Sequence, residues 1–161
     1  MSLERFHEAQ ARPWAGYDTA LAEVRAGGKQ SHWIWYIFPQ IEGLGRSSMA
    51  RAYAMRDLNE ACAYLRDPIL CVRYEAIVAA VSEQLVRGIG VEDLMGGRTD
   101  ALKLVSSLTL FRAAAEQLAR ADPDYASLAE HLAALLGQTS EQGYSACDFT
   151  LARIADGPPK E

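Results

Sequence analysis

The chain has few cysteines and histidines, and their spacing argues against disulfide and metal sites. It has three cysteines, an odd number, and no CxxC pair, so we expect neither a disulfide framework nor a cysteine-based zinc site. The three histidines are scattered without HxxxH or HExxH spacing, which leaves no helical pair of ligands for a metal ion. We therefore predict no metal and no cofactor.

The sequence also lacks a long hydrophobic run and an excess of positive charge. No stretch approaches the roughly 18 apolar residues of a membrane-spanning helix, and the acidic residues among the first ten positions do not fit a signal peptide. The net charge is −5, whereas non-specific DNA binding depends on a surplus of lysine and arginine. We expect a cytoplasmic protein that binds neither membranes nor DNA.

Length and composition fit one globular domain, because the chain has 161 residues, 50% of them hydrophobic and 23% charged. Apolar residues recur at helical spacing, most clearly over residues 70–85. Asp67-Pro68 and Asp122-Pro123 have the pattern of helix starts, with Asp as cap and Pro in first position. We predict an all-α fold, a compact single-domain bundle of about eight short helices over residues 1–156, with a disordered tail at 157–161.

The segment at residues 31–40, SHWIWYIFPQ, is ambiguous between helix and strand. Its aromatic and β-branched residues are typical of strands. Ser31 is a good helix N-cap, however, and Pro39 is a good terminator. We predict a short helix, because nearly every other segment is helical and a single strand would have no partner.

The same region holds the main candidate for a binding site. It includes two of the three tryptophans, and Gly43-Leu44-Gly45 follows, just before the start of a predicted helix. Glycines let backbone amides approach a ligand, and helix N-termini attract anions. The glycine segment lacks the GK[ST] ending of a P-loop, so the prediction is a pocket for a small anionic or nucleotide-like ligand, such as ADP-ribose. The candidate ligand-binding residues here are Lys29, Trp33, Trp35, Tyr36, Gln40, Arg46 and Ser47.

A second group of polar residues lies on the predicted long helix that follows Thr99. Asp100, Lys103 and Ser107 are spaced by three and four residues, so they share one stripe of that helix. Lys103 lies among apolar residues, where a partly buried ammonium group needs a partner. Lys103 and Ser107 join the ligand-binding candidates, and His32 and Asp100 are the candidate acid–base residues for catalysis.

Three interpretations of these residues stay open at the level of sequence, and with them the question of whether the protein is an enzyme. The first is a pocket that binds or processes a small anionic ligand. The second is a non-catalytic protein–protein interaction module, or a homo-oligomer, that uses the segment of Trp33 and Trp35. The third is a purely structural motif, in which the aromatic residues form core and the glycines form turns. Convergence of the charged candidates on one cavity would favour the first.

Several blocks of the sequence resemble the bacterial family known as domain of unknown function 1810. They are KQSHWIWYIFPQIEGLG at 29–45, AYLRDPIL at 63–70, DALKLVSSLTLF at 100–111 and DFTL at 148–151. The resemblance covers about residues 3–154 and implies a compact all-α domain, but it carries no activity. The residues that match the family's blocks are Lys29, His32, Trp33, Trp35, Tyr36, Pro39, Gln40, Arg46, Asp100, Lys103, Ser106, Ser107 and Asp148.

Some members of that family carry the label calpastatin. Calpastatins are disordered inhibitors that are poor in aromatic residues, whereas this chain has 9% aromatic residues and the composition of a folded domain. The label therefore implies nothing for the function of this protein.

Overall fold

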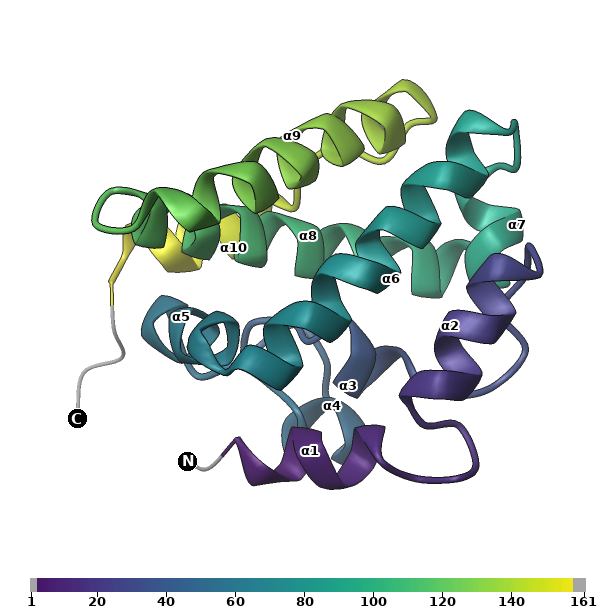
Figure 1. The fold of residues 1–161 in the computed structure, drawn as a ribbon, viewed down its shortest axis with the longest axis horizontal. Coiled ribbons are helices and arrows are strands. Elements are labelled where there is room, and N and C mark those ends of the chain that lie inside the picture. The colour runs from purple at the N-terminus through teal and green to yellow at the C-terminus, as the bar shows by residue number, and fades with distance from the viewer. Residues whose placement is uncertain (1–2, 158–161) are drawn as a thin grey trace.

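A computed structural model describes residues 3–157, which form a helical domain without a β-sheet (Figure 1). The predicted all-α class is confirmed. Three of the helices are single turns of four or five residues. The elements are α1 (Glu4–Gln10), α2 (Tyr17–Arg25), α3 (Ile34–Ile37), α4 (Ser48–Ala52), α5 (Leu58–Arg66), α6 (Pro68–Val86), α7 (Val91–Met95), α8 (Arg98–Ala119), the 3-10 turn η1 (Pro123–Tyr125), α9 (Ala126–Glu141) and α10 (Asp148–Ala155).

The long helix α8 is the centre of the fold. It packs against α3, α5, α7, α9 and α10, and α6 crosses in front of it in Figure 1. Between α5, α6 and α8 lie the rings of Tyr64, Tyr74 and Phe111, with 4.5 Å between the centres of the last two. The Tyr74 hydroxyl is fully enclosed and lies 3.0 Å from the Ser107 hydroxyl. This bond satisfies two polar groups that would otherwise be costly to bury.

Asp67 begins α6 in the way that the Asp-Pro pattern predicts. Its Oδ1 accepts hydrogen bonds from the amides of Ile69 and Leu70 at 3.0 and 3.1 Å, and Pro68 occupies the first helical position. Its Oδ2 lies 2.7 Å from Nε2 of His7 on α1. One carboxylate therefore caps α6 and ties α1 to it.

The ambiguous segment forms α3, a single helical turn, so the prediction of a helix is confirmed. Ser31, however, does not cap it: the N-cap position is Trp33, without a side-chain cap bond. The Ser31 hydroxyl donates instead to Glu23 Oε2 on α2, at 2.5 Å. A carboxylate brought close by tertiary folding has displaced the local bond that Ser31 would otherwise make.

Two expected absences concern the part of the chain that the structure describes. Among residues 3–157, no helix is long and apolar enough to cross a membrane. In the same range, no three His, Cys, Asp or Glu side chains come together as metal ligands would. Of the predicted disordered tail, only Gly157 lies within the described residues.

Replacement of Asp67 by alanine should destabilise the protein, because α6 loses its cap. Burial raises the pKa of Asp67, but the hydrogen bonds from His7, Leu70 and Ile69 outweigh this effect and lower the pKa below its usual 3.8. A carboxyl group of lowered pKa stabilises the fold above its unfolded-state pKa, and this stabilisation is lost as the pH falls through the folded-state pKa. Urea unfolding of Asp67→Ala at neutral pH should show a loss of about 1–2 kcal/mol.

The gap between wild type and Asp67→Ala should narrow as the pH falls below about 4, since the wild-type carboxylate then becomes protonated. Asp67→Asn is the matched control, because asparagine caps a helix about as well as aspartate but has no charge to lose. It should keep most of the stability and show a weaker pH dependence. A constant gap between wild type and Asp67→Ala from neutral to acid pH would contradict this account.

Candidate functional site

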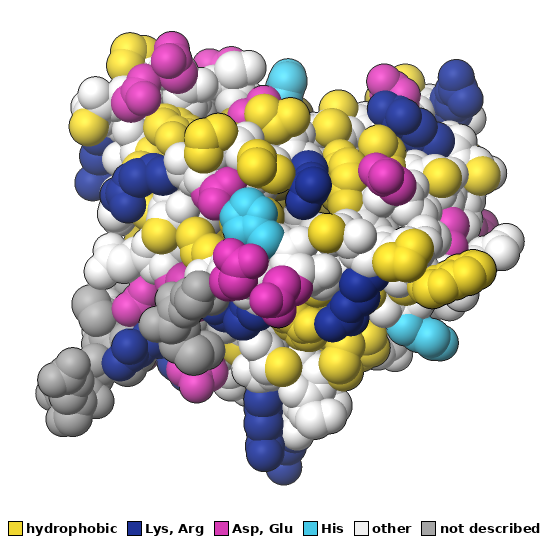
Figure 2. Space-filling view, turned by 60° about the horizontal axis from the view of Figure 1, so that its bottom comes forward, with side chains coloured by type: hydrophobic (Ala, Val, Ile, Leu, Met, Phe, Trp, Pro, Cys, Tyr) yellow, Lys and Arg dark blue, Asp and Glu magenta, His cyan; other side chains and the backbone are white. Residues whose placement is uncertain are grey.

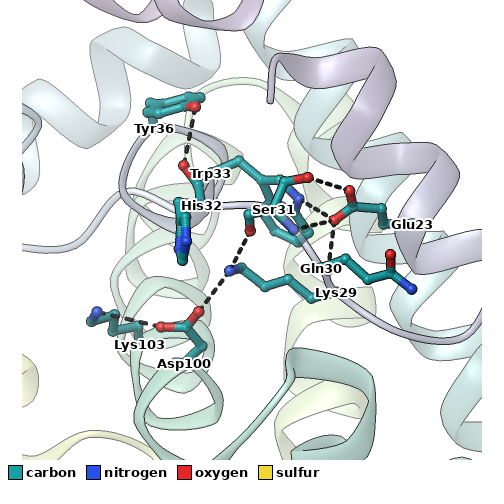
Figure 3. A network of polar contacts seen from close by, with 9 residues as sticks. All are labelled: Glu23, Lys29, Gln30, Ser31, His32, Trp33, Tyr36, Asp100 and Lys103. Atoms are coloured by element: carbon teal, nitrogen blue, oxygen red, sulfur yellow. Dashed lines mark hydrogen bonds and ion pairs between the residues drawn. The ribbon is translucent and has the colours of Figure 1, made fainter. Parts of the chain in front are cut away.

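Lys29, Asp100 and Lys103 form one ionic cluster, although they come from segments far apart in the sequence (Figure 3). Nζ of Lys29 lies 2.8 Å from Oδ2 of Asp100, and Nζ of Lys103 lies 3.3 Å from Oδ1. One carboxylate thus bridges two ammonium groups, and the formal charge of the three side chains is one positive. We call these three residues the two-lysine cluster.

Lys29 is the enclosed member of the two-lysine cluster, with a side chain only 6% exposed. Its ammonium group also donates to the carbonyl oxygen of Ser31 at 2.6 Å and lies 5.0 Å from the centre of the Trp33 ring. Removing an ammonium group from water costs several kcal/mol unless it is paired and hydrogen-bonded. The carboxylate of Asp100, the carbonyl group and the indole face meet that need.

Lys103 is the open member of the two-lysine cluster. Its side chain is 26% exposed, and that of Asp100 is 21% exposed. The ammonium group lies 4.9 Å from the centre of the Trp35 ring. Each of the two lysines therefore lies against an indole ring. The side of the cluster that is accessible to solvent is formed by Asp100, Lys103 and Trp35.

Glu23 on α2 holds the loop that carries Lys29. Its Oε1 accepts hydrogen bonds from the amides of Gln30 and Ser31 at 2.8 and 2.9 Å and from Nε1 of Trp33 at 2.9 Å. Burial raises the pKa of Glu23, but the bonds from Ser31, Gln30 and Trp33 outweigh it and lower the pKa to about 2. The charged carboxylate thereby fixes the backbone from which Lys29 reaches Asp100.

Sequence reasoning missed Glu23, and no sequence signal would have found it. Two of its partners are backbone amides, which every residue except proline carries, so side-chain type does not encode the contact. The sequence likewise does not predict that α7 contacts the same loop. The amide of Lys29 donates to the carbonyl of Leu94 at 2.8 Å, and a Cβ atom on Gly96 would lie 3.2 Å from the Lys29 carbonyl oxygen, at a φ of +80°.

His32 is exposed, and its backbone carbonyl accepts a hydrogen bond from the Tyr36 hydroxyl at 3.3 Å. Figure 3 shows its imidazole ring pointing toward the side on which Asp100 and Lys103 lie. The ring is therefore accessible to solvent on the side of the two-lysine cluster where Asp100 and Lys103 lie. This is the position that an acid–base residue for a ligand on that side would need.

Trp35 also lines a small hollow next to α4. The hollow has a volume of about 50 Å³, compared with roughly 300–1,000 Å³ for pockets that enclose drug-sized ligands. It has room for one or two water-sized groups, and a whole nucleotide would not fit inside it. Its lining residues are Trp35, Gln40, Ile41, Glu42, Gly43, Leu44, Gly45, Ala50, Arg51, Tyr53 and Ala54.

Arg46 and Ser47 are exposed, and they neither line this hollow nor bond to the two-lysine cluster. The Ser47 hydroxyl caps α4 by accepting from the amide of Ala50 at 3.1 Å. The arginine that lines the hollow is Arg51. On the face drawn in Figure 2, basic side chains are interspersed with acidic and hydrophobic ones and do not form a continuous basic patch.

Three predicted ligand-binding residues lie in the core, namely Trp33, Tyr36 and Ser107, at 0–2% exposure. The Tyr36 hydroxyl donates to the carbonyl of Ala15 at 2.6 Å, and the Ser107 hydroxyl pairs with Tyr74. In this structure these side chains offer no surface to a ligand. Trp33 is buried and so cannot contribute to an exposed aromatic patch at this segment, whereas Trp35 is partly exposed.

The Glu23→Gln variant should be less stable than wild type, because the uncharged amide loses charge-assisted hydrogen bonds and turns an NH₂ group toward donors. The expected loss at pH 7 is about 1–3 kcal/mol in urea unfolding. The folded-state pKa of Glu23 lies below its usual value of 4.5, at about 2, so its stabilisation is complete above pH 4.5 and disappears as the pH falls toward 2. The difference from wild type should therefore shrink over that acid range.

Glu8→Gln, at an exposed glutamate of α1, serves as the control and should follow wild type across the same pH range. Equal stability of Glu23→Gln and wild type at pH 7 would show that the loop does not depend on this carboxylate.

Comparison with known proteins agrees with the resemblance in the sequence. The family model described as "Protein of unknown function (DUF1810)" matches residues 1–134. The crystal structure of the conserved hypothetical protein Rv1873 from Mycobacterium tuberculosis is similar, with a TM-score of 0.80 and 35% sequence identity over 95% of this chain and 96% of that chain. No curated protein matches. The chain belongs to the DUF1810 family.

Proposed function

We propose that the protein binds a small anionic ligand at the open side of the two-lysine cluster. The observation that carries the proposal is the charge balance there, since two ammonium groups share one carboxylate. An ammonium group has three donors. Lys103 forms one ion pair and lies over one indole ring, which leaves donors on its partly exposed head for a carboxylate or phosphoryl oxygen.

Contacts within the protein hold the two-lysine cluster in place, which favours binding. Lys29 is held by Asp100 and Ser31, and its loop is held by Glu23. A ligand therefore does not have to order these groups when it binds, so less conformational entropy is lost. The position of Lys103 is fixed in turn by the same carboxylate, one turn away on α8.

The start of α8 adds positive potential at the same place. The helix has 22 residues, and its N-cap is Gly97, which has no side chain to bond the first amides. Unpaired amides and the aligned peptide dipoles make such an end attractive to an anion. Asp100 lies in that first turn, so this helix end is close to the two-lysine cluster.

Trp35 and His32 would contact the remainder of the ligand. An aromatic or nucleotide-like ring would lie against the partly exposed edge of Trp35, since Lys103 covers one face of the indole. The hollow beside Trp35 is too small to enclose such a ring, so the ligand lies across the surface and we expect modest affinity. ADP-ribose, which combines phosphates with a ring, belongs in the set of ligands to be tested.

For proton transfer at this site, His32 is a better candidate than Asp100. Both carboxylate oxygens of Asp100 are paired with lysine ammonium groups, so a base at this position would first have to release one of them. The His32 imidazole is exposed on the same side. The proposal therefore gives Asp100 the part of an anchor for the lysines and leaves any acid–base step to His32.

A thermal-shift panel tests the proposal with inorganic phosphate, small carboxylates, ribose 5-phosphate, adenosine monophosphate and ADP-ribose. A ligand at 100 times its dissociation constant stabilises the fold by about 2.7 kcal/mol. For a chain of this size that corresponds to a rise in Tm of roughly 5–10 °C. At least one compound of the panel should produce this rise, and Lys103→Met should abolish it.

Arg112→Met is the matched control, because it removes one positive charge from the same helix at an exposed position that pairs with Glu116. It should retain the response of wild type. Isothermal titration should agree with the thermal shifts: wild type and Arg112→Met should bind the ligand with similar affinity, and Lys103→Met should bind it much more weakly. Absence of any response to the whole panel, or a response that Lys103→Met retains, would rule out this function.

A further inference from the structure

Helix α6 has one face that no other described element covers, and exposed apolar side chains lie on that face. Large hydrophobic side chains are exposed at seven described positions, and three of these lie on α6: Ile69 at 52%, Val72 at 65% and Val86 at 74%. In Figure 1 the helix crosses the front of the molecule, and none of the described elements covers it from that side. Exposed apolar side chains that gather on an uncovered helix face favour a binding partner at that face.

The exposed face follows a seven-residue spacing. Val72, Ala79 and Val86 are seven residues apart and exposed, so with 3.6 residues per turn they form a nearly straight line along the helix, about 21 Å long. Glu75 and Glu83 are exposed on either side of this line. Val72 and Val86 are β-branched and Ala79 is small, so another helix could pack closely along this line.

The surface beside this line is also shaped for a helix. A groove of about 190 Å³ lies between α6 and α9 and is lined by Val78, Ala79, Ser82, Glu83, His131 and Ala134. Alanine at its centre lets another backbone approach closely. The groove widens the face from one helix to two, because α9 packs beside α6.

We propose that this face binds a second copy of the chain, with the two α6 helices antiparallel and a two-fold axis at Ala79. Val72 and Val86 lie seven residues to either side of Ala79. Antiparallel pairing about that residue therefore places each Val72 against Val86 of the other copy and the two Ala79 side chains against each other. The surface is complementary to itself, as a two-fold interface requires.

The glutamates decide the orientation. On a helical projection, Glu75 and Ser82 lie on one side of the line, and Glu83 and Ala76 lie on the other. Antiparallel pairing puts each Glu75 opposite Ser82 and each Glu83 opposite Ala76. Parallel pairing would put each glutamate against the same glutamate of the other copy, and such like-charge contacts are destabilising.

The size of the face sets the expected strength. With 19 residues, α6 is about 28 Å long, so a contact along this helix and its neighbour α9 is small. Stable complexes bury about 800 Å² per partner. We therefore expect a weak dimer in exchange with monomer, to be sought at concentrations from about 10 µM to about 1 mM.

Sedimentation velocity over that concentration range tests the proposal on the full chain. The average mass of wild type should rise from monomer toward dimer, and Val72→Glu should stay monomeric because it puts a charge against the apolar side chain of Val86 in the other copy. Leu151→Glu, at a leucine of α10 that is 46% exposed, is the matched control and should associate like wild type. A wild-type protein that stays monomeric over the whole concentration range overturns the proposal. This outcome would mean either that nothing binds this face or that a different protein does.

Disulfide trapping tests the register in a Cys147→Ser background, since the other two cysteines, Cys62 and Cys71, are buried. Under diamide, Ala79→Cys should form a covalent dimer because the two residues meet at the axis. Glu75→Cys should not, since the rise of the helix separates its two copies by about 12 Å, beyond the reach of about 7 Å. Efficient linkage of Glu75→Cys would overturn the antiparallel arrangement.

Discussion

The structure around the candidate site depends on the burial of one ammonium group. Lys29 comes after α2, and its side chain, only 6% exposed, must find a negative charge in the interior. The carboxylate that meets it is Asp100, in the first turn of α8, the helix against which most of the domain packs. Because this pair joins the loop to the central helix, it also determines where Trp33, Trp35 and Lys103 lie.

Local physical chemistry was enough to predict the helical class and several helix ends. Asp67 caps α6 because its partners are the next amides in its own chain, and Ser47 caps α4 for the same reason. Ser31 has the same intrinsic capping ability, but it donates to Glu23. The difference is the approach of a second helix, which residue type and spacing do not encode, and so prediction failed where a tertiary partner competed with a local one.

The candidate site was predictable to the extent that its contacts follow helix geometry. Asp100 and Lys103 are three residues apart on one helix, so their pairing follows from spacing. Their meeting with Lys29 was foreseen only as one of several outcomes, because it depends on how α2, α7 and α8 pack. At Arg46 the local pattern was misleading. The glycines and the helix start beside it indicated a ligand-binding site. The helix is only five residues long, however, and Arg46 makes no bond to the two-lysine cluster.

The composition of the two-lysine cluster favours a role in binding in addition to a role in stabilising the fold. A buried ion pair seldom stabilises a fold more than apolar residues of the same volume would, because desolvation offsets the attraction between the charges. Lys29 and Asp100 alone would satisfy each other and fix the loop to α8. Lys103 adds a second positive charge to the same carboxylate, with 26% of its side chain exposed, although Lys29 alone would balance the charge of Asp100. A second ammonium group that is partly open to solvent and already positioned by a carboxylate and an indole is suited to the recognition of an anion.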